Sequence, residues 1–345
     1  MHSYSASPFI EISLPPAYIL PIPALISLYI SLAIFDLILL RYQHVVSPKA
    51  VRWCMTVIHI LVPMIVISDN PPLNVLIAAT PWFLATYTAS MSFSENLTLI
   101  GWIKALLQIV IDREAEVKSE TLIRLGGLKK MALGMMKVSF LHLAVNPMLP
   151  EHTQEALAYP WTHPMSMFYT ILFGVKGYCM LGVVDFFIGV EQTLFAWNLV
   201  SLFHSPILAS SPRDFWSRRW NRIVRNLLHA HVFSSNKAKT TKVQHSPRPS
   251  FWSTRQGRGL LTFVISGVFH ELIIMSACRK LTLENFMFFT LQGIAVMIEV
   301  ELRQGALKQQ PRGKTRIMCI AAQLFFMSVS GRLFNGPFLR YDFFS

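Results

Sequence analysis

The chain has 345 residues, of which 53% are hydrophobic and 14% are charged, whereas soluble domains carry about 25% charged residues. The hydrophobic residues fall in long continuous runs, which excludes an ordinary soluble domain and indicates an integral membrane protein. The formal net charge of +13 would suit a nucleic-acid-binding protein, but its distribution along the chain indicates a different partner.

The positive charge is concentrated in residues 205–258, which contain eleven Lys and Arg residues and a single acid, Asp214. Cytoplasmic loops of membrane proteins carry such an excess of Lys and Arg. We therefore expect residues 205–258 to be a basic cytoplasmic loop that includes an interfacial helix, and we expect membrane lipid and no nucleic acid as a partner.

The apolar runs predict an all-α integral membrane protein with about eight transmembrane helices in one domain, residues 1–345. The expected spans are 18–40, 53–68, 73–91, 131–145, one crossing within 165–203, 259–278, 284–300 and 317–333. Two crossings within 165–203 would move the basic loop out of the cytoplasm, so we expect one crossing plus a re-entrant or interfacial helix. The interleaved charges of residues 93–137 predict a solvated helix pair or a surface-lying amphipathic segment.

Residues 213–233 are expected to form one amphipathic helix on the membrane surface. Four apolar residues fall at the helical spacing i, i+4, i+7 and i+11: Trp216, Trp220, Ile223 and Leu227. Arginines occupy the opposite side of this helix, which is typical of a helix lying in the interface. Asn221 lies at the edge of the apolar stripe, where an uncharged amide can both donate and accept hydrogen bonds.

His270 is an ionisable residue roughly midway along the expected span 259–278. An ionisable group at that depth is a functional-site candidate, although a histidine packed and hydrogen-bonded to a neighbouring helix is the structural alternative. Glu271 follows it, but adjacent residues on a helix point about 100° apart, so we expect Glu271 to make a separate contact. No second histidine stands at i+4, and the cysteines form no Cys-x-x-Cys, so no metal site is predicted.

Two motifs together resemble the membrane-bound O-acyltransferases. The first is Phe215-Trp216-Ser217-Arg218-Arg219-Trp220-Asn221, and the second, about fifty residues later, is Phe269-His270-Glu271-Leu272. The longer phrase that begins at Ser211 is similar to the wax-synthase branch, which includes plant wax ester synthases and fungal acetyltransferases of terpenoid and meroterpenoid biosynthesis. The resemblance implies one helical bundle around an internal chamber, in the endoplasmic reticulum membrane.

Carried over to this chain, the resemblance implies that His270 is the catalytic base and Asn221 the second catalytic polar residue. The expected reaction transfers an acyl group from acyl-CoA to the hydroxyl of a lipophilic alcohol, with acyl-CoA as co-substrate and no bound cofactor. The expected contacts to substrate or CoA are Trp216, Arg218, Arg219, Trp220, Arg222 and Glu271.

Three functions stay open at this point. Acetyl transfer from acetyl-CoA to a terpenoid or meroterpenoid alcohol, in secondary-metabolite biosynthesis, is the favoured interpretation of the motif region. The alternative is a wax ester or sterol synthase that transfers a long-chain fatty acyl group. A multi-pass transporter or a lipid-binding scaffold would be a non-enzyme alternative; a transporter predicts repeated halves, and the sequence has no visible internal symmetry.

Overall fold

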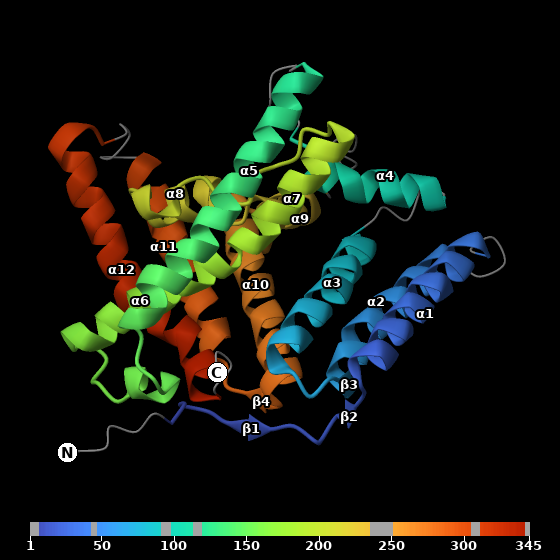
Figure 1. Cartoon of the computed structure of the whole chain (residues 1–345), viewed down its shortest axis with the longest axis horizontal. Helices are drawn as coiled ribbons and strands as arrows, with labels where there is room; N and C mark the ends of the chain where they lie inside the picture. The colour runs from blue at the N-terminus through green and yellow to red at the C-terminus, as the bar shows by residue number, and fades with distance from the viewer. Residues whose placement is uncertain are drawn as a thin grey trace.

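The computed structural model describes residues 7–42, 47–90, 98–112, 119–234, 251–304 and 311–341. The described residues are mostly helical (Figure 1). The α-helices of the described residues are α1 (Ile22–Arg41), α2 (Pro48–Ile65), α3 (Pro71–Ser90), α4 (Leu99–Val110), α5 (Glu120–Phe140), α6 (Pro164–Met180), α7 (Gly182–Phe195), α8 (Pro212–Asp214), α9 (Arg222–Ser234), α10 (Arg255–Cys278), α11 (Glu284–Gln304) and α12 (Gly313–Arg340).

Six helical segments of the described residues are long and apolar enough to cross a membrane: Ile22–Arg41, Pro48–Ile65, Pro164–Phe195, Arg255–Cys278, Glu284–Arg303 and Gly313–Arg340. They confirm the predicted class, an all-α multi-pass membrane protein. The expected number of about eight also counted residues 73–91 and 131–145. Residues 73–90 belong to α3, and residue 91 lies outside the described residues. Residues 131–145 form the end of α5 and its π-helical extension Leu141–Val145. Neither segment is among the six.

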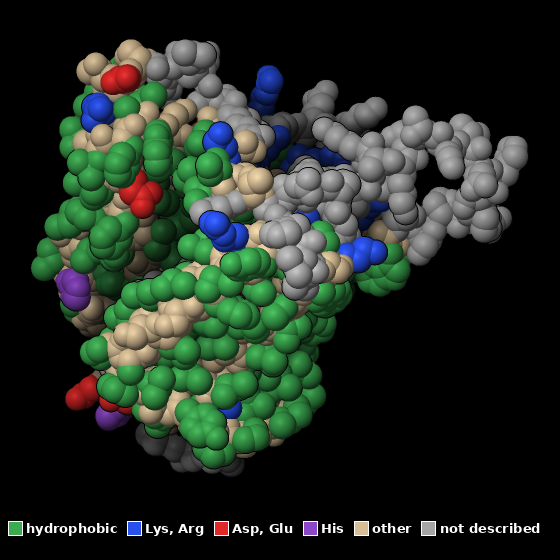
Figure 2. Space-filling view, turned by 90° about the vertical axis from the view of Figure 1, so that its right-hand side faces the viewer, with side chains coloured by type: hydrophobic (Ala, Val, Ile, Leu, Met, Phe, Trp, Pro, Cys, Tyr) green, Lys and Arg blue, Asp and Glu red, His purple; other side chains and the backbone are tan. Residues whose placement is uncertain are grey.

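The bundle has α1, α2 and α3 on one side and α11 and α12 on the other, with α10 between them (Figure 1). Hydrophobic side chains cover most of the face shown in Figure 2, and Lys and Arg side chains gather towards its upper part. An apolar belt with Lys and Arg gathered at one end is the surface expected of a protein that sits in a bilayer.

Helices α5 and α7 pack closely against each other, which the sequence did not indicate. A Cβ atom added to Gly127 would lie 2.7 Å from the carbonyl oxygen of Gly189, and a Cβ atom on Gly189 would lie equally close to the carbonyl oxygen of Gly127. Only glycine therefore allows the two backbones to touch at this level. Residues 164–195 form one long apolar segment that bends at Leu181, where the sequence predicted a crossing plus a separate re-entrant or interfacial helix.

The N-terminal segment lies across the end of the bundle that is lowest in Figure 1. Strand β1 (Ile12–Ser13) pairs antiparallel with β4 (Lys280–Leu281), and β2 (Tyr18–Ile19) pairs parallel with β3 (Val66–Ile67). These short pairs tie the N-terminal segment to the α10–α11 connection and to the end of α2.

Candidate active site

His270 lies on α10 with its ring held by the preceding turn of the same helix. Its Nδ1 atom is 2.8 Å from the carbonyl oxygen of Ser266. Because a carbonyl oxygen can only accept a hydrogen bond, Nδ1 carries the proton, and in a neutral imidazole Nε2 then keeps a free lone pair. Nε2 has no hydrogen-bond partner among the described residues. The geometry thus presents one basic nitrogen on a ring of fixed orientation.

Aromatic rings from three helices surround the His270 ring. The ring centroid of Phe289 on α11 lies 4.3 Å from that of His270, and Phe334 on α12 follows at 5.6 Å. Phe269 on α10 lies at 6.1 Å. These aromatic neighbours make the surroundings of the half-buried imidazole largely apolar.

Trp216 joins this aromatic cluster, because its side chain points into the bundle and not onto the membrane surface. Its ring centroid lies 5.5 Å from that of Phe289. Its indole Nε1 donates a 3.0 Å hydrogen bond to Oε1 of Gln292, a fully buried residue of α11. Gln292 Nε2 donates in turn to Ser330 Oγ of α12, at 3.0 Å. The first motif is therefore connected to α11 and α12 beside His270.

The prediction of one continuous helix over residues 213–233 is wrong. Residues Phe215–Arg219 form a π-helical turn, and the chain breaks at Asn221, whose φ is +37°. The Phe215 and Trp220 rings stack 5.3 Å apart, and the Trp220 amide donates to the Phe215 carbonyl. This wider turn rotates Trp216 away from the lipid-facing stripe that regular helical spacing predicted.

Asn221 begins α9. Its Oδ1 atom accepts a 3.2 Å hydrogen bond from the backbone amide of Val224, which is the arrangement of an N-cap. Asparagine tolerates the left-handed backbone better than most residues do. No direct contact joins Asn221 to His270 among the described residues, so its expected catalytic role stays a prediction.

Glu271 has a structural role that the sequence did not reveal. Its side chain is buried, and its two oxygens accept hydrogen bonds from three backbone amides: Thr282, Leu283 and Phe286, at 3.4, 3.1 and 3.1 Å. These amides lie at the start of α11, where the helix dipole favours a negative charge. Glu271 therefore fixes α11 against α10, next to His270, which fits the expected separate contact; contact with substrate stays a prediction.

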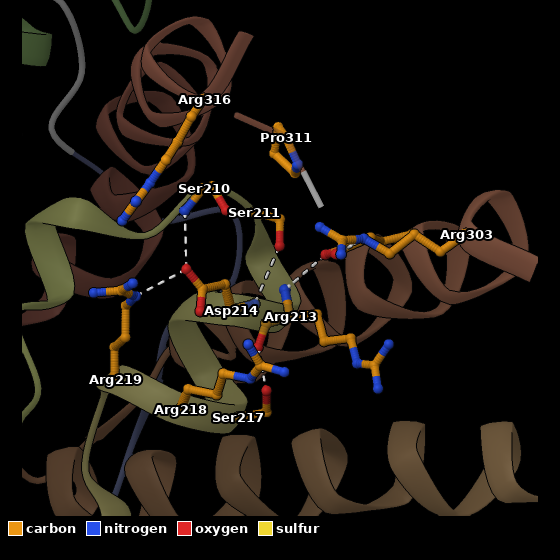
Figure 3. A pocket seen from close by; sticks show the side chains of 11 residues that line it. Ser210, Ser211, Arg213, Asp214, Ser217, Arg218, Arg219, Arg303, Pro311 and Arg316 are labelled. Carbon is orange, nitrogen blue, oxygen red and sulfur yellow. Dashed lines mark hydrogen bonds and ion pairs between the residues drawn. The ribbon is translucent and has the colours of Figure 1, made fainter. Parts of the chain in front are cut away.

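The expected arginine contacts divide into paired and unpaired side chains. Arg219 Nε lies 2.8 Å from Asp214 Oδ2, and Arg222 lies 3.5 Å from Asp112. Arg218 is exposed and has no partner among the described residues. Arg218 and Arg219 line a cavity of about 150 Å³ together with Arg213, Arg303 and Arg316 (Figure 3).

We call this cavity the arginine pocket. It brings together the first motif, the end of α11 and the start of α12. Arg303 and Arg316 were not among the residues predicted to form the site. Because they lie before and after an expected cytoplasmic loop, they served only to predict the orientation of the neighbouring spans in the membrane. Within the described part of the chain, no three His, Cys, Asp or Glu side chains gather where they could hold a metal ion, and the predicted metal-free site stays a prediction.

The fold and the site define a multi-pass helical membrane protein with a histidine enclosed by aromatic rings. Residues 197–291 match the model of the membrane bound O-acyl transferase family. The matched segment includes both Asn221 and His270, and it supports the resemblance that the two motifs predicted.

Curated relatives agree with the wax-synthase branch. The chain is 35% identical over 114 residues to probable long-chain-alcohol O-fatty-acyltransferase 9 of Arabidopsis thaliana, which covers 33% of this chain and 32% of the relative. It is 29% identical over 180 residues to probable long-chain-alcohol O-fatty-acyltransferase 2 of the same plant, covering 50% of this chain and 48% of the relative. The matched parts thus span half the length of these relatives or less.

Proposed function

We propose that the protein transfers an acyl group from acyl-CoA to the hydroxyl of a lipophilic alcohol. The observation that carries this proposal is the His270 ring, held at Nδ1 by the Ser266 carbonyl and with Nε2 unpartnered among the described residues. A base of fixed tautomer in an apolar, aromatic setting suits proton abstraction from an alcohol. The match of residues 197–291 to an O-acyl transferase family supports the same reaction class.

In the proposed mechanism, Nε2 of His270 takes the proton of the acceptor hydroxyl while the alcohol oxygen attacks the thioester carbonyl. The Ser266 carbonyl accepts from Nδ1–H throughout, so it stabilises the imidazolium that forms. The tetrahedral intermediate then expels the CoA thiolate, which receives the proton from Nε2. Asn221 orients a reactant or stabilises the oxyanion. Trp216 and Trp220 contact the bound substrate or CoA. The aromatic wall limits competing hydrolysis.

For the substrates, we propose a long-chain fatty acyl donor and a long-chain or similarly lipophilic alcohol. This was the alternative interpretation of the sequence, and the names of the relatives favour it. Acetyl transfer to a terpenoid alcohol was the favoured interpretation, but no relative named above carries such an activity in its name. It remains the second candidate, because the same two residues would serve either acyl length.

For the location, we propose the endoplasmic reticulum membrane with the basic loop 205–258 in the cytoplasm. The unequal distribution of Lys and Arg supports this orientation. Residues 235–250 of that loop lie outside the described residues. In this orientation the water-soluble acyl-CoA approaches from the cytoplasm, while the lipophilic alcohol approaches through the lipid bilayer.

The test is a microsomal assay that offers palmitoyl-CoA or acetyl-CoA with hexadecanol or a polycyclic terpenoid alcohol. The expected result is ester formation with palmitoyl-CoA and hexadecanol. Preference for acetyl-CoA with the terpenoid alcohol would favour the second candidate. Absence of ester from every pair, with the protein correctly inserted, would contradict the proposed function.

A further inference from the structure

The arginine pocket contains two kinds of guanidinium group. Some are paired with a carboxylate, and the others are not. Asp214 pairs with Arg219 at 2.8 Å and also accepts from the Ser210 amide. Glu299 pairs with Arg303 at 2.7 Å. The two carboxylates at the cavity are therefore engaged in holding its wall in place (Figure 3).

Three guanidinium groups remain: Arg213, Arg218 and Arg316 have exposed side chains and no partner among the described residues. Arg213 contributes only backbone groups to the local network: its amide donates to Glu299 Oε2 at 2.8 Å, and its carbonyl oxygen accepts from Ser217 Oγ. Three like charges around one small cavity repel each other, and an anion between them would relieve that repulsion. Guanidinium groups bind phosphate with two parallel hydrogen bonds, which makes a phosphate-bearing ligand the best match.

The pocket lies on the same face of α11 as the wall of the His270 site. Glu299, Gln292 and Phe289 are spaced by seven and three residues, so their side chains share one face of the helix. Ten residues separate Glu299 from Phe289, which corresponds to about 15 Å along the axis. Phe289 is the ring that lies 4.3 Å from His270.

This spacing fits the arm of coenzyme A. An extended chain advances about 1.2 Å per bond, and about thirteen bonds join the nearer phosphorus of CoA to its sulfur, so the arm spans about 15 Å. We infer that the arginine pocket binds the diphosphate of acyl-CoA and that Arg316, from α12, is one of its ligands. The identity of the ligand rests on the proposed acyl transfer; a cationic pocket for phosphate does not.

The experiment compares palmitoyl-CoA with palmitoyl-pantetheine, which has the same thioester and no phosphate. In the wild-type protein, kcat/KM should be at least about tenfold higher for palmitoyl-CoA, because phosphate contacts to guanidinium groups are strong charge-assisted bonds. Arg316→Ala and Arg218→Ala should each lower this ratio about tenfold, because each should reduce kcat/KM for palmitoyl-CoA more than kcat/KM for palmitoyl-pantetheine. Arg316→Lys should recover part of the ratio, because lysine keeps the charge and loses the planar fork.

Arg312→Ala is the matched control. Arg312 is exposed at the start of the same helix, outside the pocket, and its removal should leave the ratio unchanged. A ratio that does not respond to Arg316 or Arg218 would overturn the inference. So would an Arg316 effect seen only as a changed response to anionic phospholipid vesicles, since the occupant would then be a lipid headgroup.

Binding of free CoA separates this inference from the proposed function. With the purified full chain in detergent, CoA should raise the apparent melting temperature, pantetheine should not, and Arg316→Ala should abolish the difference. Such a result in a protein that forms no ester would support the pocket and contradict the acyltransferase. Ester formation with no CoA-specific, Arg316-dependent shift would support the acyltransferase and overturn the pocket.

Discussion

Trp216→Phe tests whether the first motif faces the bundle, because it removes the hydrogen bond from the indole to Gln292. The carbonyl of Gln292, which is fully buried, would then have no donor, and an unsatisfied buried acceptor costs about 1–3 kcal/mol. The smaller ring also leaves a gap beside the rings of Phe289 and Phe263, whose centroids lie 5.5 and 5.7 Å from that of Trp216. This gap adds a cost of about 1 kcal/mol. We therefore expect a loss of about 2–4 kcal/mol in stability.

The assay is the apparent melting temperature of the purified protein in detergent. The single variants Trp216→Phe and Gln292→Leu should both melt lower than the wild type. The double variant should melt higher than the sum of the two shifts predicts, because removing both partners leaves fewer unpaired polar groups. Trp252→Phe is the control, since the Trp252 side chain is 54% exposed. The reasoning would be refuted if the single variants melted at the same temperature as this control, or if the two shifts in melting temperature were strictly additive. Either result would indicate that Trp216 lies on the membrane surface.

Further predictions concern the helices that carry the site. Glu271→Gln removes the charge that binds three amides at the start of α11; we expect about 2–4 kcal/mol of destabilisation and lower activity, whereas the surface variant Glu151→Gln should change neither. Gly267→Leu should separate α10 from α11, because even a Cβ atom would lie 3.0 Å from the Cα atom of Phe286; the melting temperature should fall, and a normal value would contradict the packing described. Asp36→Ala leaves buried His59 without its 2.6 Å partner, so it should destabilise the docking of α1 by about 3–5 kcal/mol, measured by protease sensitivity, and Asp36→Leu with His59→Leu should recover much of the loss. The hydrogen bond from Lys280 lowers the pKa of Glu11, so this pair stabilises the folded protein above the ordinary pKa of a glutamate and stops doing so as the pH falls through the lowered pKa. Hydrogen exchange at the Leu14 amide should therefore accelerate at acidic pH in the wild type. It should accelerate much less in Glu11→Gln.

Hydropathy alone predicted the helices that carry the site. The span expected at residues 259–278 lies within α10, and the one expected at 284–300 lies within α11. Length and apolar character decide these elements locally, because a backbone in lipid must satisfy its hydrogen bonds within the helix. His270 could be singled out for the same reason, as an ionisable side chain within an apolar run.

Contacts between distant segments could not be predicted in this way. Regular spacing assigned Trp216 to a lipid-facing stripe, but Gln292, seventy-six residues away, holds its indole. The π-helical turn depends on such partners, and no local pattern indicates it. The apolar stripe indicated that one face of the segment is buried, but it did not indicate whether lipid or other helices bury it.

Charge counting had the same limit for the arginine pocket. Arg303 and Arg316 follow the positive-inside pattern as well as any other basic residue does. Only the folded chain brings them beside Arg218. The role of Glu271 as a cap was likewise hidden, because the amides that it binds carry no sequence signal.

The central claim is that Nε2 of His270 removes the proton of an acceptor alcohol. The most direct measurement is single-turnover release of CoA by the purified His270→Ala protein, compared with His142→Ala, which removes an exposed histidine outside the site. The account predicts that His270→Ala slows the acyl-transfer step by at least about a hundredfold without weakening CoA binding, while His142→Ala behaves as the wild type. Transfer at the wild-type rate by inserted, folded His270→Ala would contradict it.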